Sequence, residues 1–238
     1  MSRETAGGWG FMAIRIVTKD CTALSDADLA EMAELPGGSG SPYEIGTLSK
    51  QAEAWVLVTL ARGDDDVLRG YSFCTLERIG GTPSVLIGLA AVGRAADCAD
   101  VLATMMRDQL RRAVLAFPDE DVLVGTRLRC AGGFEAFSTL QDIVPRPGHK
   151  ASGEERAWGR RLAKRFGIDA GNYDDRTFIA TGDGSLPLAL DFDVADRRKV
   201  DRAVAKLFGD VDVAGGGAMI VFGWAMAEDL DALLKASR

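Results

Sequence analysis

The stretch from Ser84 to Phe117 constrains the fold more than any other part of the chain, because it joins a buried strand directly to a long helix. Residues 84–92 are almost wholly apolar, which is typical of a strand covered on both faces. From Asp100 onward the apolar residues take helical spacing, at Leu102, Met105, Met106, Leu110, Ala113, Val114 and Phe117. A helix that begins directly after a strand presents unpaired N–H groups and the positive end of its dipole. The turn at Gly93 and Arg94 is therefore a candidate anion site.

Strands are predicted on both sides of this unit. Residues 54–61 and 67–78 have the apolar content of strands, and short polar turns separate them from each other and from 84–92. Such turns join antiparallel neighbours, so the three segments are expected to form an antiparallel meander. Residues 122–128 follow the long helix as a further strand, and a strand–helix–strand crossover places its two strands parallel.

The rest of the chain alternates shorter elements with turns. Strands are predicted at 13–17, 176–181, 186–192 and 218–223, and helices at 25–35, 154–166, 196–208 and 228–235. A short helix or turn is expected at 132–137, and loops at 36–42 and 141–152. Together these elements predict an α+β fold with a mixed central sheet, made of the antiparallel meander and the strand–helix–strand unit, and with an extra strand and helices near the C-terminus.

Composition narrows the function classes. The net charge of −7 makes the chain acidic, so broad binding of nucleic acid through its phosphates is not expected. No stretch has the 18 or so consecutive apolar residues of a membrane-spanning helix. The only histidine, His149, and four scattered cysteines argue against a zinc or other metal site. Free thiols and the lack of a secretory pattern predict a soluble cytoplasmic protein.

One helix is basic in an otherwise acidic chain. Residues 154–166 place Trp158, Leu162 and Phe166 on one side, and the other faces carry Arg156, Arg160, Arg161, Lys164 and Arg165. A solvated charged face and a surface for an anionic partner are both compatible with this pattern.

The order strand, helix, three antiparallel strands, long helix, strand and short helix resembles the GNAT superfamily of N-acetyltransferases, over residues 13–140 and on toward 192. In that family the fourth strand and the following helix hold acyl-CoA. Its pyrophosphate rests on backbone N–H groups of a turn with the pattern Arg/Gln-x-x-Gly-x-Gly/Ala. The matching segment here runs from Arg94 to Ala99, which fit the first and last positions. The resemblance implies that acyl-CoA contacts Val92, Arg94, Ala95, Ala96, Asp97, Cys98 and Ala99.

Asp97 departs from this pattern, because the family has glycine there. Glycine lets the backbone approach a phosphate closely and adopt a positive φ. A carboxylate beside the pyrophosphate would instead cost on the order of 1 kcal/mol or more. Asp97 is also well suited to cap the helix, with Asp100 in the first turn, so the helix has partly filled the position of an anion with its own carboxylates.

The resemblance also directs attention to the residues around the acyl group. GNAT enzymes commonly use a carboxylate or ordered water as base and a tyrosine after the fifth strand as acid, but residues 130–140 contain no tyrosine. Glu77 is a candidate base, Glu135 a polar group near the acyl end and Cys130 a candidate nucleophile. The alternatives are a surface position for Glu77 and a small buried hydrophobe for Cys130.

Two functions from different classes follow. The first is an N-acyltransferase in which the amine of a small molecule or peptide attacks the thioester of acetyl-CoA or another acyl-CoA. The 36–47 loop would then help to shape the acceptor pocket. The second is a GNAT-like protein without CoA binding, acting as a ligand-binding or protein-interaction module through residues 141–190 and the C-terminal region. The apolar run 218–226 leaves a homodimer interface and core burial both open.

The domain organisation expected from these patterns has three parts. Residues 1–12 form a flexible leader, and 13–192 a GNAT-like domain with a loop-and-helix insertion at 141–172. Residues 193–238 form a C-terminal α/β extension packed on that domain.

Overall fold

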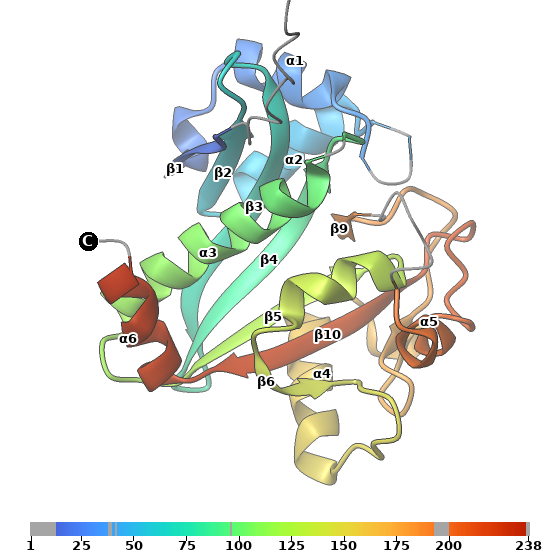
Figure 1. Cartoon of the computed structure of the whole chain (residues 1–238). Helices are drawn as coiled ribbons and strands as arrows, with labels where there is room; N and C mark the ends of the chain where they lie inside the picture. Colours follow the sequence, from blue (N-terminus) through green and yellow to red (C-terminus); the bar gives the residue numbers. More distant parts are fainter. Residues whose placement is uncertain (1–12, 38–39, 41, 96, 193–199, 237–238) are drawn as a thin grey trace, which may run out of the picture.

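The computed structural model of the chain describes residues 13–37, 40, 42–95, 97–192 and 200–236. The predicted leader at 1–12 lies outside these ranges, as do Ala96 and the start of the helix predicted at 196–208. The described strands form one mixed sheet in the order β1-β2-β3-β4-β9-β5-β10-β8-β7, with β6 paired to β10 (Figure 1). The predicted α+β class is confirmed.

The first half of the sheet is antiparallel, as the short turns predict. It consists of β1 (Arg15–Asp20), β2 (Leu57–Arg62), β3 (Leu68–Ile79) and β4 (Thr82–Val92). Helix α1 (Asp26–Glu34) begins with a capping box between Ser25 and Asp28. The sequence reasoning missed α2 (Ile45–Ala54), because its apolar residues are few and scattered among polar ones.

The strand–helix–strand unit is also present. Helix α3 (Cys98–Ala116) follows β4 and leads to β5 (Val122–Leu128), which lies parallel to β4. Its buried residues recur at the predicted helical spacing, so one stripe of α3 packs on the sheet.

The C-terminal elements extend the same sheet. Strand β10 (Ala218–Ala225) pairs antiparallel with β5 from Met219 to Ala225 and lies between β5 and the strands β6 and β8. Its side chains are almost all buried, so the apolar run at 218–225 belongs to the core. The remaining elements are η2 (Ala131–Phe137), α4 (Gly153–Arg165), η3 (Ala170–Asn172), β7 (Tyr173–Asp174) and α6 (Ala227–Ala236).

Four predicted elements need correction. The loop expected at 141–152 begins with strand β6 (Gln141–Val144), which pairs with β10. The strands expected at 176–181 and 186–192 shrink to β8 (Ile179–Ala180) and β9 (Leu190–Asp191). Within the described residues, the helix expected at 196–208 is reduced to α5 (Arg202–Leu207), capped by Asp201. Turn residues such as Gly182 and Gly184 limit the ladders to short pieces.

The two faces of the sheet carry different helices. Helices α3 and α6 and the η2 segment cover one face, called the front face here, whereas α1, α2 and α4 cover the rear face (Figure 1). In the described ranges no helix is long and apolar enough to cross a bilayer.

Candidate functional site

The site is built where β4 and β5 part. The two strands pair only from Ser84↔Leu123 to Leu86↔Gly125, after which Thr126 Oγ1 donates to the carbonyl of Ile87 at 2.9 Å. At the same level β4 is irregular, because its register with β3 shifts between Ile87 and Ala90. Such bulges re-aim backbone groups and recur next to active sites. Beyond this point β4 and β5 are no longer partners, which leaves a wedge-shaped opening between them.

Strand β9 fills this opening. Ala90 and Ala91 of β4 pair with Leu190 and Asp191, and Leu128 of β5 pairs with Leu190 from the other side. The amide of Ala90 donates to the carbonyl of Ala189 at 3.2 Å. The segment 186–192, predicted as a strand, therefore contributes only the two residues of β9, which pair with β4 on one side and β5 on the other.

The turn after β4 lies at the open end of the wedge. Its amides are partly used within the turn, since Ala95 N donates to Gly93 O at 3.0 Å and Cys98 N to Ala95 O at 3.2 Å. Val92 is buried at the end of β4, whereas Arg94 is exposed and Ala99 is exposed on the first turn of α3. Ala96 lies outside the described residues.

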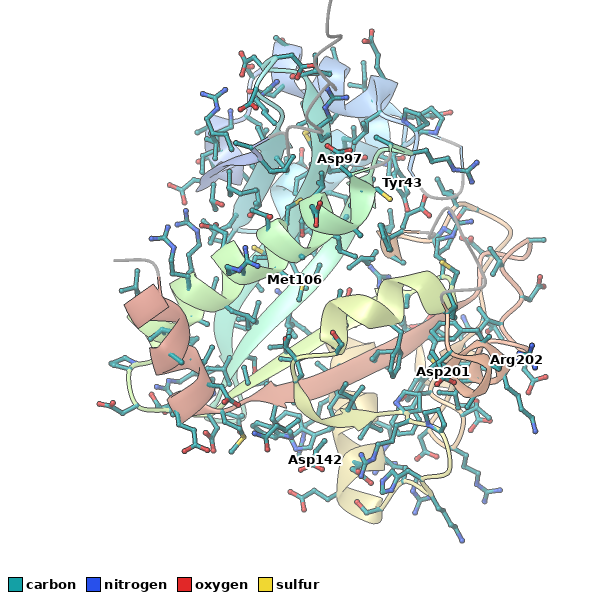
Figure 2. All side chains as sticks on the ribbon, in the orientation of Figure 1. Tyr43, Asp97, Met106, Asp142, Asp201 and Arg202 are labelled. Carbon is teal, nitrogen blue, oxygen red and sulfur yellow. The ribbon has the colours of Figure 1, made fainter. Side chains whose placement is uncertain are left out.

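Asp97 occupies the N-cap position of α3, as predicted, but its side chain caps no amide. Its φ of −94° lies in the ordinary region, so the backbone here does not need glycine. Atom Oδ2 of Asp97 is buried and finds no hydrogen-bond partner among the described residues. Figure 2 marks Asp97 at the start of α3, Met106 near the middle of the helix and Tyr43 close to the same end of the sheet.

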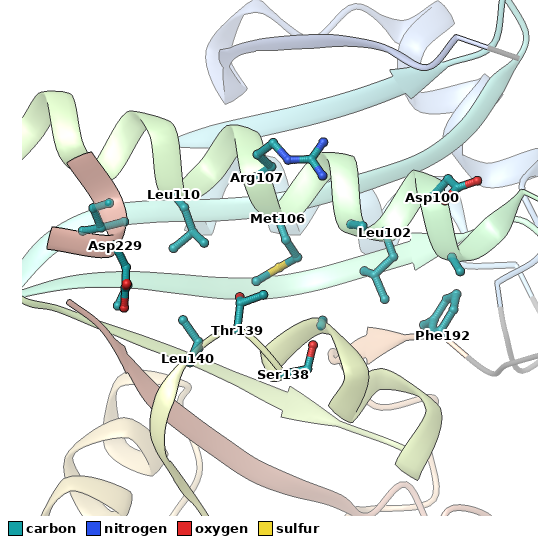
Figure 3. Close-up of a pocket in the computed structure, with 15 residues that line it drawn as sticks. Asp100, Leu102, Met106, Arg107, Leu110, Ser138, Thr139, Leu140, Phe192 and Asp229 are labelled. Atoms are coloured by element: carbon teal, nitrogen blue, oxygen red, sulfur yellow. The ribbon is translucent and has the colours of Figure 1, made fainter. Parts of the chain in front are cut away.

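A cavity of about 540 Å³ lies on the front face between α3 and the η2 region (Figure 3). It extends along α3 from Ala99 past Met106 to Leu110, and Ser138 lies on its opposite side. Phe192, directly after β9, lines it as well. The cavity is mostly apolar, and it adjoins both the α3 turn and the filled wedge.

A second cavity, of about 700 Å³, lies on the rear face between the start of α2 and the 184–188 segment. Tyr43, Glu44 and Lys50 line it from the α2 side, and Arg129 lies on it at the end of β5. Side chains on a strand alternate between its two faces, so Arg129 faces the same side as Gly125, four residues earlier. Gly125 faces Leu162 of α4 on the rear. The front and rear cavities are thus on opposite sides of the sheet, with β9 between them.

Buried polar side chains gather on the rear side of β9. Asp191 is 2% exposed and Arg129 7% exposed, and their nearest charged atoms, Oδ2 and Nη1, lie 3.5 Å apart. The Tyr43 hydroxyl donates to the carbonyl of Pro187 at 2.8 Å. Burial raises the pKa of Tyr43 well above its usual value, and the charge of Asp191 raises it further. Burial also raises the pKa of Tyr71, and the neighbouring Tyr43 and Asp191 raise it further.

The predicted catalytic residues are not brought together. Glu77 lies opposite Ser84, at the closed end of the β4–β5 pair, and its carboxylate accepts from Arg165 Nε at 2.7 Å. From there to Val92 a strand extends about 26 Å, at roughly 3.3 Å per residue. Cys130 is at the wedge: it is half-buried, and its thiol donates to the carbonyl of Phe192 at 2.8 Å. Glu135 lies in η2.

The sequence reasoning missed the cluster of Tyr43, Tyr71, Arg129 and Asp191. The arginines offered a signal, because Arg127 and Arg129 close an otherwise apolar strand and share one face of it. Asp191 is the corresponding charge in the apolar segment 186–192. Nothing local connects these positions, so their proximity was not predictable. Within the described ranges no group of His, Cys, Asp and Glu side chains is placed to hold a metal ion.

Comparison with known proteins finds similarity in structure only. No family profile and no curated protein sequence matches the chain. The crystal structure of AtaTR bound with AcCoA is 13% identical, with 93% of this chain and 98% of that chain covered and a TM-score of 0.36. Escherichia coli ElaA is 15% identical, with 59% and 95% covered and a TM-score of 0.34. The NatC complex bound to Gag peptide and CoA is 17% identical, with 51% and 80% covered and a TM-score of 0.35.

The topology of the chain itself gives the assignment. An antiparallel meander runs from β1 to β4, α3 crosses over to a parallel β5, and β4 and β5 part beyond a bulge in β4. The meander and the parallel crossover are the arrangement predicted from the order of the elements, whereas the bulge and the parting of β4 from β5 come from the structure alone. The described elements therefore have a GNAT-like order and pairing.

Proposed function

We propose that this protein is an acyl-CoA-dependent N-acyltransferase, which uses acetyl-CoA or another acyl-CoA and an amine acceptor. The observation that supports it most is the parting of β4 from β5 at a bulge, with the start of α3 at the open end and a cavity on each face. The front cavity suits the donor, because it follows α3 from its first turn. The rear cavity, bordered by residues 42–51, suits the acceptor, in line with the role predicted for the 36–47 loop.

In the proposed reaction the acceptor amine attacks the thioester carbonyl carbon. A C–N bond forms, the C–S bond breaks, and the proton lost by the amine ends on the departing sulfur. Cys130 is the predicted catalytic residue nearest to the wedge, whereas Glu77 lies at the far end of β4. Because β9 separates the two cavities, the transfer requires β9 to leave the wedge.

Three observations favour a second function. Strand β9 fills the wedge, two amides of the α3 turn are used internally, and Asp97 adds a carboxylate there. These three features fit a GNAT-like protein that does not bind CoA and acts as a ligand-binding or protein-interaction module. Such a protein would use the two cavities separately.

Thermal unfolding with millimolar acetyl-CoA separates the two functions. Under the first, the midpoint rises with concentration, because a ligand at about 100 times its Kd stabilises the native state by about 2.7 kcal/mol. Longer acyl-CoAs and free CoA are measured alongside. If none of them shifts the midpoint, the acyltransferase proposal fails and the CoA-free module remains.

Asp97→Gly is expected to tighten acetyl-CoA binding by about fivefold. The substitution removes a negative charge beside the phosphates, and a contact worth on the order of 1 kcal/mol corresponds to that factor. Isothermal titration calorimetry measures the change. Asp119→Gly is the matched control, because Asp119 follows the other end of α3 in a turn with a φ of 60°. An unchanged affinity for Asp97→Gly would mean that the phosphates do not bind at this turn.

A further inference from the structure

The lining of the rear cavity carries charges that acyl transfer alone does not require. Arg129 lies at the end of β5, Lys50 lies on α2, and Glu44 is the N-cap residue of α2. Glu44 and Lys50 are exposed at the rim, whereas Arg129 is 7% exposed. A cavity of about 700 Å³ falls within the usual range for small-molecule sites, roughly 300–1,000 Å³.

Arg129 has capacity for another partner. Its Nε and Nη1 atoms are buried, and neither makes a hydrogen bond to any residue that the structure describes. Asp191 is its ion-pair partner, but at 3.5 Å the contact is longer than a charge-assisted hydrogen bond, which is about 2.7–2.9 Å. A guanidinium presents its N–H groups as a planar fork that matches a carboxylate. Buried N–H groups without acceptors are costly, so a ligand that supplies acceptors is bound favourably once the guanidinium turns from Asp191 toward the cavity.

The rest of the lining contains a negatively charged residue and several apolar side chains. Glu44 is a carboxylate, which suits an ammonium group, while Lys50 adds a second positive charge for the anionic end of a ligand. Leu186, Leu188 and Val213 supply apolar surface from the opposite side. The cavity therefore combines a carboxylate that can pair with a cation, two cationic side chains that can pair with an anion, and an apolar wall.

We propose that the rear cavity binds an α-amino acid with an apolar side chain, whose carboxylate is held by Arg129 with help from Lys50 and whose ammonium faces Glu44. The inference rests on the proposed function for the role of this molecule as the acyl acceptor. It goes further by assigning the chemical class of the acceptor and the residues that recognise it.

Binding of this carboxylate is coupled to the wedge through Asp191. Arg129 is the ion-pair partner of Asp191, and Asp191 is one of the two residues of β9. A ligand carboxylate that engages Arg129 bidentately replaces Asp191 as its partner. The pairing that holds β9 between β4 and β5 is then weakened, and the route between the two cavities opens only when an acceptor is present.

The test uses the full-length protein with L-leucine, L-methionine and L-phenylalanine as probes, measured by the thermal unfolding midpoint and by calorimetry. At least one probe is expected to bind with saturation. Its amide, which keeps the amine and the side chain but lacks the carboxylate, is expected to bind at least about tenfold more weakly, as for loss of a buried hydrogen-bonded charge pair. If none of the three probes binds, or if the amide binds as tightly as the acid, the inference is wrong.

Variants assign the carboxylate to its residues. Arg129→Gln is expected to lose the preference for the acid over the amide. Lys50→Gln changes an exposed side chain, so it tests the site even if Arg129→Gln fails to fold. Its preference for the acid over the amide should fall by about fivefold. Lys164→Gln, on the exposed side of α4, is the control and should leave the preference unchanged. An unchanged preference in Lys50→Gln and Arg129→Gln would remove both residues from the site and overturn the inference.

The outcome is distinguishable from that of the proposed function. Amino-acid binding without any response to acyl-CoA would retain the assignment of the rear cavity and eliminate acyl transfer. A response to acyl-CoA with no binding of the three amino acids would do the reverse.

Discussion

Leu190→Ser is expected to tighten acetyl-CoA binding by about tenfold, because it weakens the packing that holds β9 between β4 and β5. Leu190 is 1% exposed and pairs with both β4 and β5. When only a fraction of the molecules is competent to bind, the apparent Kd is the intrinsic Kd divided by that fraction, and a substitution that populates the open form lowers the apparent Kd. Calorimetry with acetyl-CoA measures the change.

Leu186→Ser is the matched control for this prediction. It lies in the same segment and is half-buried, but it lies outside the two-residue ladder of β9. Its affinity for acetyl-CoA is expected to match that of the unmodified protein. If Leu190→Ser remains folded and binds acetyl-CoA no more tightly than the control, β9 does not compete with the ligand.

Asp191→Ala is expected to lower the free energy of unfolding by about 3 kcal/mol, because removing one partner of a buried ion pair leaves the other charge uncompensated. Arg129 and Asp191 are both nearly inaccessible to solvent. Urea denaturation measures the loss. The Arg129→Met, Asp191→Leu double variant is expected to recover most of it, since apolar replacement of both partners leaves no buried charge.

Asp175→Ala provides the comparison for a pair near the surface. Asp175 is paired with Arg160 of α4, whose side chain is 55% exposed. Pairs of this kind contribute about 0–1 kcal/mol, so the loss should stay within that range. If Asp191→Ala lowers the free energy of unfolding as little as Asp175→Ala does, the buried ion pair with Arg129 does not stabilise the fold.

The two predictions concern the same structural element. Strand β9 is held in the wedge by the ladder on its two sides and by the Arg129–Asp191 pair on the rear. Tyr71 of β3, opposite Ala91, is fully buried and has a hydroxyl with no hydrogen-bond partner in the described part of the chain. Movement of the β9 segment would break the hydrogen bond that the Cys130 thiol donates to Phe192.

The elements that the sequence predicted well are those with long periodic patterns. Strand β5 has the predicted bounds, α3 differs from prediction by a residue or two at its ends, and β3 and β4 form the expected hairpin. The weak predictions fall on segments whose pattern is short. Helix α2 is short and has few large apolar side chains. Strand β6 lies in a turn-rich segment, and its pairing with β10 decides its conformation.

The candidate site shows the same division. The position of Asp97 at the helix N-cap followed from residue type and spacing, but its failure to cap did not, because side-chain orientation depends on neighbours. Cys130 is predicted as a candidate from its place after β5, but its partner Phe192 lies far away in the chain. The role of Arg129 and Lys50 depends on a cavity formed by α2 and the distant 184–188 segment, so local sequence patterns do not predict it.

The sequence by itself determined the strand–turn–helix unit at 84–117, the parallel crossover to 122–128 and the carboxylate at Asp97. These features follow from short-range patterns of apolar residues and from the stereochemistry of short connections, which act within one element or between neighbours. Only the tertiary structure decided that β9 lies between β4 and β5 and that Asp191 lies beside Arg129. Both depend on contacts between residues far apart in the chain, where the energy comes from burial and ion pairing rather than from local preference.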